Sequence, residues 1–343
     1  MYKRIFSILQ YIIFMGGGLF LVWWQLRSMT TQEKDEFVTA ITQARYWLVL
    51  PIIILSLLSH LSRSMRWKLL LEPMDYHPKL KNVFAVTMVG YLANSAIPRL
   101  GEILKCSFLA RYEHLKLNRL VGTIIVERTF DLICYLIFIG ITVLIQIDVV
   151  GQYVEQKLET IASSPGMPLW ARALIVAAGI VMIWQLIKYF FRKYPDNRFI
   201  SRINAFIKGL GEGFSTIRRL RHSRAFILHT LFIWSMYLLQ IYIGFYAMDG
   251  TDHLSVKAAF SVLTLATLAM IATPGGIGSF PIFVMQTLAI YGIAHPLGKA
   301  FGWLIWGVST SIMIIAGCIA LLLLPYMNKQ KNESHSIDTR QDH

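Results

Sequence analysis

The sequence predicts an all-α polytopic membrane protein with about six spanning helices and two short or broken helices, arranged as an inverted repeat. Three observations lead to this prediction. Hydrophobic residues make up 55% of the 343 residues, charged residues only 15%, and the mean hydropathy is +0.54, whereas soluble proteins carry about 25% charged residues. Several apolar stretches are long enough to cross a bilayer. Two further apolar stretches are short or interrupted by Pro and Gly.

Six stretches are expected to span the membrane: residues 5–26, 47–61, 120–147, 170–191, 225–248 and 300–324. A span needs about 20 apolar residues, so the second stretch is long enough only if Tyr46 and Ser62 reach the membrane interface. The first stretch is too long for the hydrophobic region of a signal peptide, and Trp23 and Trp24 do not fit a small-residue cleavage site. We therefore interpret it as a retained helix.

The two remaining apolar segments are awkward. Residues 83–97 would form a helix of about 22 Å, shorter than a hydrocarbon core of about 30 Å. Residues 258–273 and 282–293 are separated by "PGGIGSFP", which cannot continue a helix. We expect each to enter and leave the membrane on one side, with Pro98 and Gly101 making the turn in the first. The alternative is eight spans, two of them short, because tilting and local thinning accommodate short helices.

The distribution of basic residues sets the predicted orientation. The connections at 63–82 and 98–119 are basic, with Arg63, Arg66 and Lys105 among their residues, so both are assigned to the cytoplasm. Residues 5–147 and 170–324 then have the same order of elements but opposite orientations in the membrane, as in an inverted repeat. We expect both halves to belong to a single domain, residues 1–324. A polar tail, 325–343, follows in the cytoplasm. The prediction is a multi-pass protein of the inner cell membrane with both termini cytoplasmic.

Composition also limits the possible partners and cofactors. The net charge of +14 is concentrated in loops between apolar segments, which is typical of membrane topology and of contact with anionic headgroups rather than of nucleic-acid binding. Cys106, Cys134 and Cys318 lie far apart, so neither a zinc site nor a disulfide framework is expected. We predict no metal, no cofactor and no nucleic-acid partner.

Charged residues inside apolar segments are the first place to look for function, because each is costly in a membrane unless paired or hydrated. The segment "GYLANSAIPRLGEILK" at 90–105 places Asn94, Arg99, Gly101 and Glu102 at the first break. A helix that begins after the glycine would direct free N–H groups toward an anion, and a guanidinium can bind phosphate through two hydrogen bonds. A chance ion pair at the membrane surface is the alternative.

A second group, in "TIIVERTFDLICYL", comprises Glu127, Arg128 and Asp131. Glu127 and Asp131 are four residues apart and share a helix face, and Arg128 can reach Asp131. The two acidic residues outnumber the single basic one, so we expect a cation from elsewhere to balance them, with Arg99 as the candidate. A purely structural ion network is the alternative.

The third group is "TPGGIGSFP" at 273–281, where Pro274, Gly275, Gly276 and Gly278 could form an anion-binding nest of backbone amides. A tight turn that only reverses the chain would use the same residues. This ambiguity stays open at the level of the sequence.

Together the three motifs resemble the lysylphosphatidylglycerol synthase transmembrane-region family, the flippase-like membrane domain of the multiple peptide resistance factor. The resemblance covers about residues 5–324 and implies binding and translocation of a charged lipid. By motif match the resemblance marks twelve residues as functional: Asn94, Pro98, Arg99, Gly101, Glu102, Glu127, Arg128, Asp131, Pro274, Gly275, Gly276 and Gly278. Two features depart from the family. Ser279, Phe280 and Pro281 stand where many relatives carry a glutamate. The chain ends at His343, so no soluble aminoacyltransferase domain, and hence no lysine transfer, is expected.

The sequence is compatible with three functions. The preferred one is a flippase or lipid-binding transporter for an anionic or aminoacylated phospholipid, or for a polyprenyl-phosphate-linked lipid. The second is a non-transporting subunit that presents such a lipid to a glycosyltransferase or to another lipid-modifying synthase. The third is an intramembrane enzyme, which is least supported because the sequence contains no HExxH motif and no Ser/His pairing.

Overall fold

The computed structural model describes residues 16–25, 27–97, 99–146, 182, 185 and 220–329. The chain divides into two units, Met1–Arg128 with Arg219–His343, and Thr129–Arg218. In the described residues the regular structure is helical. Its elements are α2 (Thr31–Thr42), η1 (Tyr46–Leu48), α3 (Val49–Leu71), η2 (Glu72–Met74), α4 (Leu80–Ala96), α5 (Leu100–Glu113), α6 (Leu117–Ile145), α10 (Ser223–Phe245), α11 (Val256–Ala272), η3 (Pro274–Gly276), α12 (Ser279–Ile290) and α13 (His295–Met327).

Four helical segments of the described chain are long and apolar enough to cross a membrane: Tyr46–Met74, Leu117–Ile145, Ser223–Phe245 and His295–Met327. The protein is therefore a helical, multi-pass membrane protein. Residues 16–25 are helical, in agreement with the predicted first span. The predicted span at 170–191 (apart from residues 182 and 185), residues 330–343 of the predicted tail, and Pro98 lie outside the described residues.

The prediction was wrong about where the second span ends. We expected it to stop at residue 61 and a basic loop to follow, but α3 continues to Leu71. Arg63 and Arg66 therefore lie inside a spanning helix and not in a connection, and the Arg66 side chain is fully buried. The helix continues because residues 64–71 contain no Gly or Pro, and they include Trp67 and three leucines.

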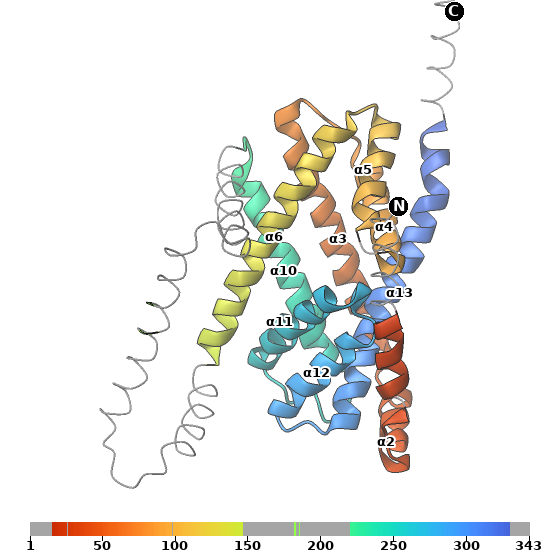
Figure 1. Ribbon diagram of the computed structural model, residues 1–343, viewed down its shortest axis with the longest axis vertical. Helices are drawn as coiled ribbons and strands as arrows, with labels where there is room; N and C mark the ends of the chain where they lie inside the picture. The colour runs from red at the N-terminus through yellow and green to blue at the C-terminus, as the bar shows by residue number, and fades with distance from the viewer. Residues whose placement is uncertain are drawn as a thin grey trace, which may run out of the picture. The chain divides into compact units, whose positions relative to one another are not determined.

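The connection predicted at 98–119 is also largely helical. α5 runs back along α4 (Figure 1), so the two helices form an antiparallel hairpin, called here the first hairpin. At its open end, Glu113 Oε1 accepts hydrogen bonds from the Lys79 amide, at 3.0 Å, and from Asn82 Nδ2, at 2.6 Å. Lys105 is accordingly a buried residue of this hairpin and not a loop residue.

α11 and α12 form a second hairpin, joined by residues 273–278. The hairpin tips meet, because η3 packs against α4 and a Cβ built on Gly275 would lie 3.9 Å from the Cα of Ser95. The open ends of the two hairpins lie at opposite ends of α13. The second hairpin leads directly into His295, the first residue of α13. At the other end, Asn328 follows α13 and exchanges side-chain hydrogen bonds of 2.9 and 3.1 Å with Asn82 of the first hairpin. In Figure 1 the first hairpin occupies the upper half of the view and the second the lower half.

Helix lengths repeat along the chain. α3 and α10 have 23 residues each, and α4 and α11 have 17 each. α5 and α12 have 14 and 12 residues, and α6 and α13 have 29 and 33. Each set of four thus comprises a long helix, a two-helix hairpin and another long helix. α3 and α10 pack side by side, with the Ser62 hydroxyl 2.9 Å from His229 Nδ1.

Candidate functional site

The break of the first hairpin is tightly built around two glycines. Gly90 of α4 and Gly101 of α5 pack backbone against backbone, and a methyl group on Gly101 would overlap the carbonyl oxygen of Gly90. Asn94 Oδ1 accepts a hydrogen bond from the Gly101 amide at 2.8 Å, which satisfies one of the free N–H groups in the first turn of α5. Asn94 and Gly101, both predicted from the sequence, therefore hold the two arms of the hairpin together at its tip.

Arg99 occupies the N-cap position of α5 with φ of 70° and ψ of −12°. This left-handed conformation is costly for a residue with a Cβ and is normally taken by Gly, Asn or Asp. The residue is exposed at the tip of the hairpin. A strained, exposed arginine at a helix break is a feature of functional sites more than of packing.

The most concentrated charge in the first unit surrounds Glu127 of α6, whose side chain is only 3% exposed. Lys105 Nζ lies 2.9 Å from Glu127 Oε2. Arg63 Nη1 and Arg66 Nη2, from α3, lie 3.5 and 3.6 Å from Glu127 Oε1. We call these four residues the basic cluster. Three cationic side chains from two helices thus converge on one buried carboxylate.

Aromatic rings and hydroxyls hold the cluster in place. The Lys105 ammonium lies 4.3 Å from the centroid of the Trp67 ring, and the Arg66 guanidinium lies 5.4 Å from that of Phe226. Trp67 Nε1 in turn donates a 2.8 Å hydrogen bond to Thr123 of α6. Arg66 also donates to the Thr230 hydroxyl at 3.2 Å. Cation–π contacts of this kind hold a charged group over the face of the ring.

The ion pairing predicted for the second motif was only partly right. Glu127 is paired, but its described cations are Lys105, Arg63 and Arg66, which take the balancing role expected of Arg99. Arg128 pairs with Glu102 of α5 at 2.8 Å, a partner that the sequence did not predict. The first and second motifs therefore meet along the α5–α6 seam. Asp131 follows in α6 and belongs to the second unit.

The glycines of the third motif make a turn with three left-handed residues. Gly275, Gly276 and Gly278 have φ of 59°, 71° and 73°. The amides of Gly276 and Ile277 donate to the carbonyls of Thr273 and Pro274 within the turn. Two of the amides that a nest would direct at an anion are thus already used. Pro274 is buried at the start of this turn.

Neighbouring helices hold the same turn from outside. The Gly275 carbonyl accepts a 2.8 Å hydrogen bond from Trp306 Nε1, and the Gly278 carbonyl accepts one of 2.8 Å from Gln25. The geometry therefore gives this motif a positioning role at the junction of the two hairpin tips.

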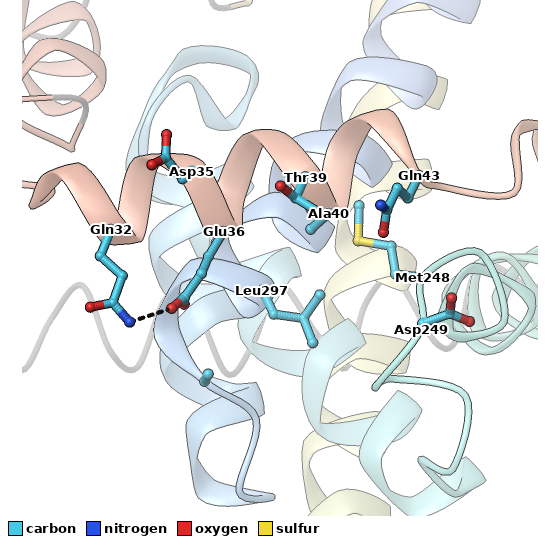
Figure 2. Close-up of a pocket in the computed structure, with 10 residues that line it drawn as sticks. Gln32, Asp35, Glu36, Thr39, Ala40, Gln43, Met248, Asp249 and Leu297 are labelled. Atoms are coloured by element: carbon cyan, nitrogen blue, oxygen red, sulfur yellow. Dashed lines mark hydrogen bonds between the residues drawn. The ribbon is translucent and has the colours of Figure 1, made fainter.

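A separate cavity of about 670 Å³ lies beside α2 and is shown in Figure 2. Its polar lining includes Asp35, Glu36 and Asp249, and Gln32 donates a 3.0 Å hydrogen bond to Glu36 (Figure 2). Asp249 also forms an ion pair with Arg45. The cavity is acidic, opposite in character to the basic cluster, and its lining contains no residue of the three sequence motifs.

Comparison with known proteins agrees with this architecture. The family model described as "Lysylphosphatidylglycerol synthase TM region" matches residues 7–325. The chain is also similar to UPF0104 membrane protein MJ1595 of Methanocaldococcus jannaschii, with 20% identity over 304 residues, covering 84% of this chain and 88% of that protein. No solved structure matches the chain. Because the family model covers nearly all of it, the chain belongs to the lysylphosphatidylglycerol synthase transmembrane-region family.

Proposed function

We propose that the protein is a lipid flippase or lipid-binding transporter that holds the phosphate of a charged lipid at the basic cluster. The observation that carries this proposal is the convergence of Arg63, Arg66 and Lys105 on the single carboxylate of Glu127 in the interior of an apolar helical protein. Basic residues inside a membrane protein are costly and commonly mark the path of a charged substrate. Guanidinium and ammonium groups are the protein's usual ligands for phosphate.

The basic cluster is not completely enclosed by the protein. The Arg63 and Lys105 side chains keep 13% and 11% of their surface exposed. Nearby, the Arg128–Glu102 pair is 51% and 30% exposed, although Arg128 lies 11 residues, about 16 Å, into α6. A charged pair at that depth is tolerated where it faces water rather than lipid. The α5–α6 seam therefore fits a hydrated vestibule in which a polar headgroup can reach the cluster.

The architecture supplies a route across the bilayer in this proposal. The tips of the two hairpins meet, and their open ends lie at opposite ends of α13. Each hairpin would therefore be re-entrant and would enter the membrane from the opposite face to the other. Inverted repeats with broken helices are a common transporter plan, with the substrate site near the breaks. Small movements of one hairpin against the other would expose the cluster to alternate sides.

Each motif residue has a role in this scheme. Lys105, Arg63 and Arg66 bind the phosphate, and Arg99 binds the headgroup as it enters past the tip. Glu127 keeps the three cations together when no lipid is bound. The remaining residues position the hairpins or the seam: Asn94, Gly101, Glu102, Arg128, Pro274, Gly275, Gly276 and Gly278. Asp131 remains a predicted member of the site.

Reconstitution tests the proposal. Proteoliposomes with fluorescent phosphatidylglycerol in both leaflets are treated with dithionite, which quenches only the outer leaflet. We expect the protected fraction of fluorescent lipid to fall in the presence of the protein alone. It should fall more slowly with the Arg63→Gln variant than with Arg111→Gln. The second variant is the matched control, because Arg111 is an exposed arginine near the end of α5. If the protein binds the lipid but the protected fraction equals that of empty liposomes, it is a presenting subunit rather than a flippase.

A further inference from the structure

The signs of the charges around the first break are strongly unequal. In the first unit, the hairpin break, the basic cluster and Arg128, the next residue after Glu127 in α6, contribute five basic residues, namely Arg63, Arg66, Arg99, Lys105 and Arg128. They contain two acidic residues, Glu102 and Glu127. Adding the charge of Asp131, the other acidic residue of the second motif, would still leave an excess of positive charge. The excess does not depend on which of these groups pair with one another.

Both acidic residues are paired, and the most exposed of these charged side chains are basic. Glu127 is 3% exposed and contacts three cations, and Glu102 contacts Arg128 at 2.8 Å. Neither carboxylate is positioned to bind an ammonium group without first giving up a cation. By contrast, the Arg99 side chain is exposed at the tip. The most exposed charged groups of this region are therefore the guanidinium groups of Arg99 and Arg128.

From this arrangement we infer that the site selects lipids by headgroup charge: it takes a phosphate-bearing lipid without ammonium groups and rejects an aminoacylated one. The inference rests on the proposed function and specifies its substrate class. Lysylation of phosphatidylglycerol adds two ammonium groups to one phosphate and makes the headgroup cationic. Placing like charges together in a site of low dielectric constant is strongly unfavourable, and such repulsion is an effective way to exclude a wrong ligand.

The selection acts against the lipid after which the family is named. The phosphate of lysylphosphatidylglycerol could still approach the basic cluster, but its lysyl group would remain near the same cations, because both are attached to one glycerol. The acidic cavity beside α2 is lined by α2 and by residues 248, 249, 294 and 297, none of which belongs to the first hairpin or the basic cluster. Glu102 and Glu127, the carboxylates of the break and of the cluster, each already contact a cation.

The test measures binding of three lipids with the same acyl chains to the detergent-solubilised protein: phosphatidylglycerol, phosphatidylethanolamine and lysylphosphatidylglycerol. We expect affinity to fall in that order, with at least about a tenfold difference between the first and the last. Increasing salt should reduce the difference, because screening weakens both attraction and repulsion. Equal affinities, or tighter binding of the lysylated lipid, would overturn the charge selection while leaving the lipid site intact.

Further measurements distinguish a failure of the charge selection from a failure of the proposed lipid site. Arg99→Glu should shift the preference toward the lysylated lipid, whereas Arg111→Glu, the same change about 18 Å away along α5, should not. An equal shift in both variants would place the selection outside this site. If none of the three lipids binds, the proposed lipid site is refuted together with the inference. Binding of inorganic phosphate without binding of phosphatidylglycerol would replace the lipid by a soluble anion and overturn the inference as well.

Discussion

Lys105 of α5 and Glu127 of α6 form an ion pair of 2.9 Å that joins the returning arm of the first hairpin to the next spanning helix. Three residues earlier in α5, Glu102 pairs with Arg128 at 2.8 Å. The two pairs have opposite polarity on adjacent residues of α6. This crossed arrangement sets the register of the two helices and places one carboxylate in the interior and one arginine at the exposed surface.

Glu127→Gln should destabilise the protein by about 3–5 kcal/mol, because it leaves buried cations without their carboxylate. We expect a lower midpoint in thermal unfolding in detergent, followed by fluorescence-detected size exclusion. Adding Lys105→Met should recover part of the loss, since it removes the closest of the unpaired charges. A Glu127→Gln protein as stable as wild type would show that the carboxylate does not hold the cluster together.

Gly101→Ala should prevent the first hairpin from closing, because the new methyl group would overlap the backbone of Gly90. Backbone atoms cannot move aside as a flexible side chain can, so we expect a loss of at least about 1–3 kcal/mol in stability. The control is Gly122→Ala in α6, where nothing lies within 4 Å of the added carbon. Alanine there should be neutral or stabilising by about 0.5–1 kcal/mol. Similar unfolding midpoints for both variants would contradict the close packing of the hairpin.

Arg99→Gly should raise stability and lower lipid affinity at the same time. Glycine removes the cost of the left-handed conformation, about 1 kcal/mol, and removes the guanidinium. Arg99→Lys should keep the fold and weaken binding less, because an ammonium cannot form the paired hydrogen bonds of a guanidinium. Thermal unfolding and phosphatidylglycerol titration of the same preparations measure both effects. Unchanged affinity in both variants would remove Arg99 from the site.

Cysteines introduced at Lys81 and Lys116, which flank the first hairpin, should both react with a membrane-impermeant maleimide from the same face of the membrane. Both positions are exposed, at the start of α4 and just before α6. The expectation follows from the hairpin, whose ends are tied together by the Glu113 hydrogen bonds. Intact and permeabilised cells give the sidedness. Labelling of the two sites from opposite faces would refute the re-entrant hairpin.

Much of the fold could be predicted from hydropathy and from Pro and Gly. The breaks near residues 98 and 273–278 and the short helices before them follow from apolar stretches interrupted by residues that stop helices. The end of the second span could not be placed this way, because the rule that assigns basic residues to cytoplasmic loops cannot distinguish a basic loop from basic side chains inside a helix. The returning arm α5 was hidden for the same reason.

The site was predicted in part. Its motif residues include Glu127, but two of the three partners of this residue, Arg63 and Arg66, lie on α3, more than 50 residues earlier, and long-range pairing has no local signal. One signal was present and unused: Ser56, His60, Arg63 and Trp67 follow one another at intervals of four, three and four residues, which places them on one helix face. A polar face of this kind in an apolar helix indicates an internal site rather than a loop.

The most direct test of the central claim, that the basic cluster binds a lipid phosphate, compares phosphatidylglycerol with diacylglycerol of the same chains by native mass spectrometry. Hydrogen bonds to charged groups contribute about 1.5–3 kcal/mol each, so the phosphate should raise affinity at least about tenfold. The difference should largely disappear in Lys105→Met and persist in Lys257→Met, a change of an exposed lysine at the start of α11. Equal affinities of the wild-type protein for the two lipids would contradict the account.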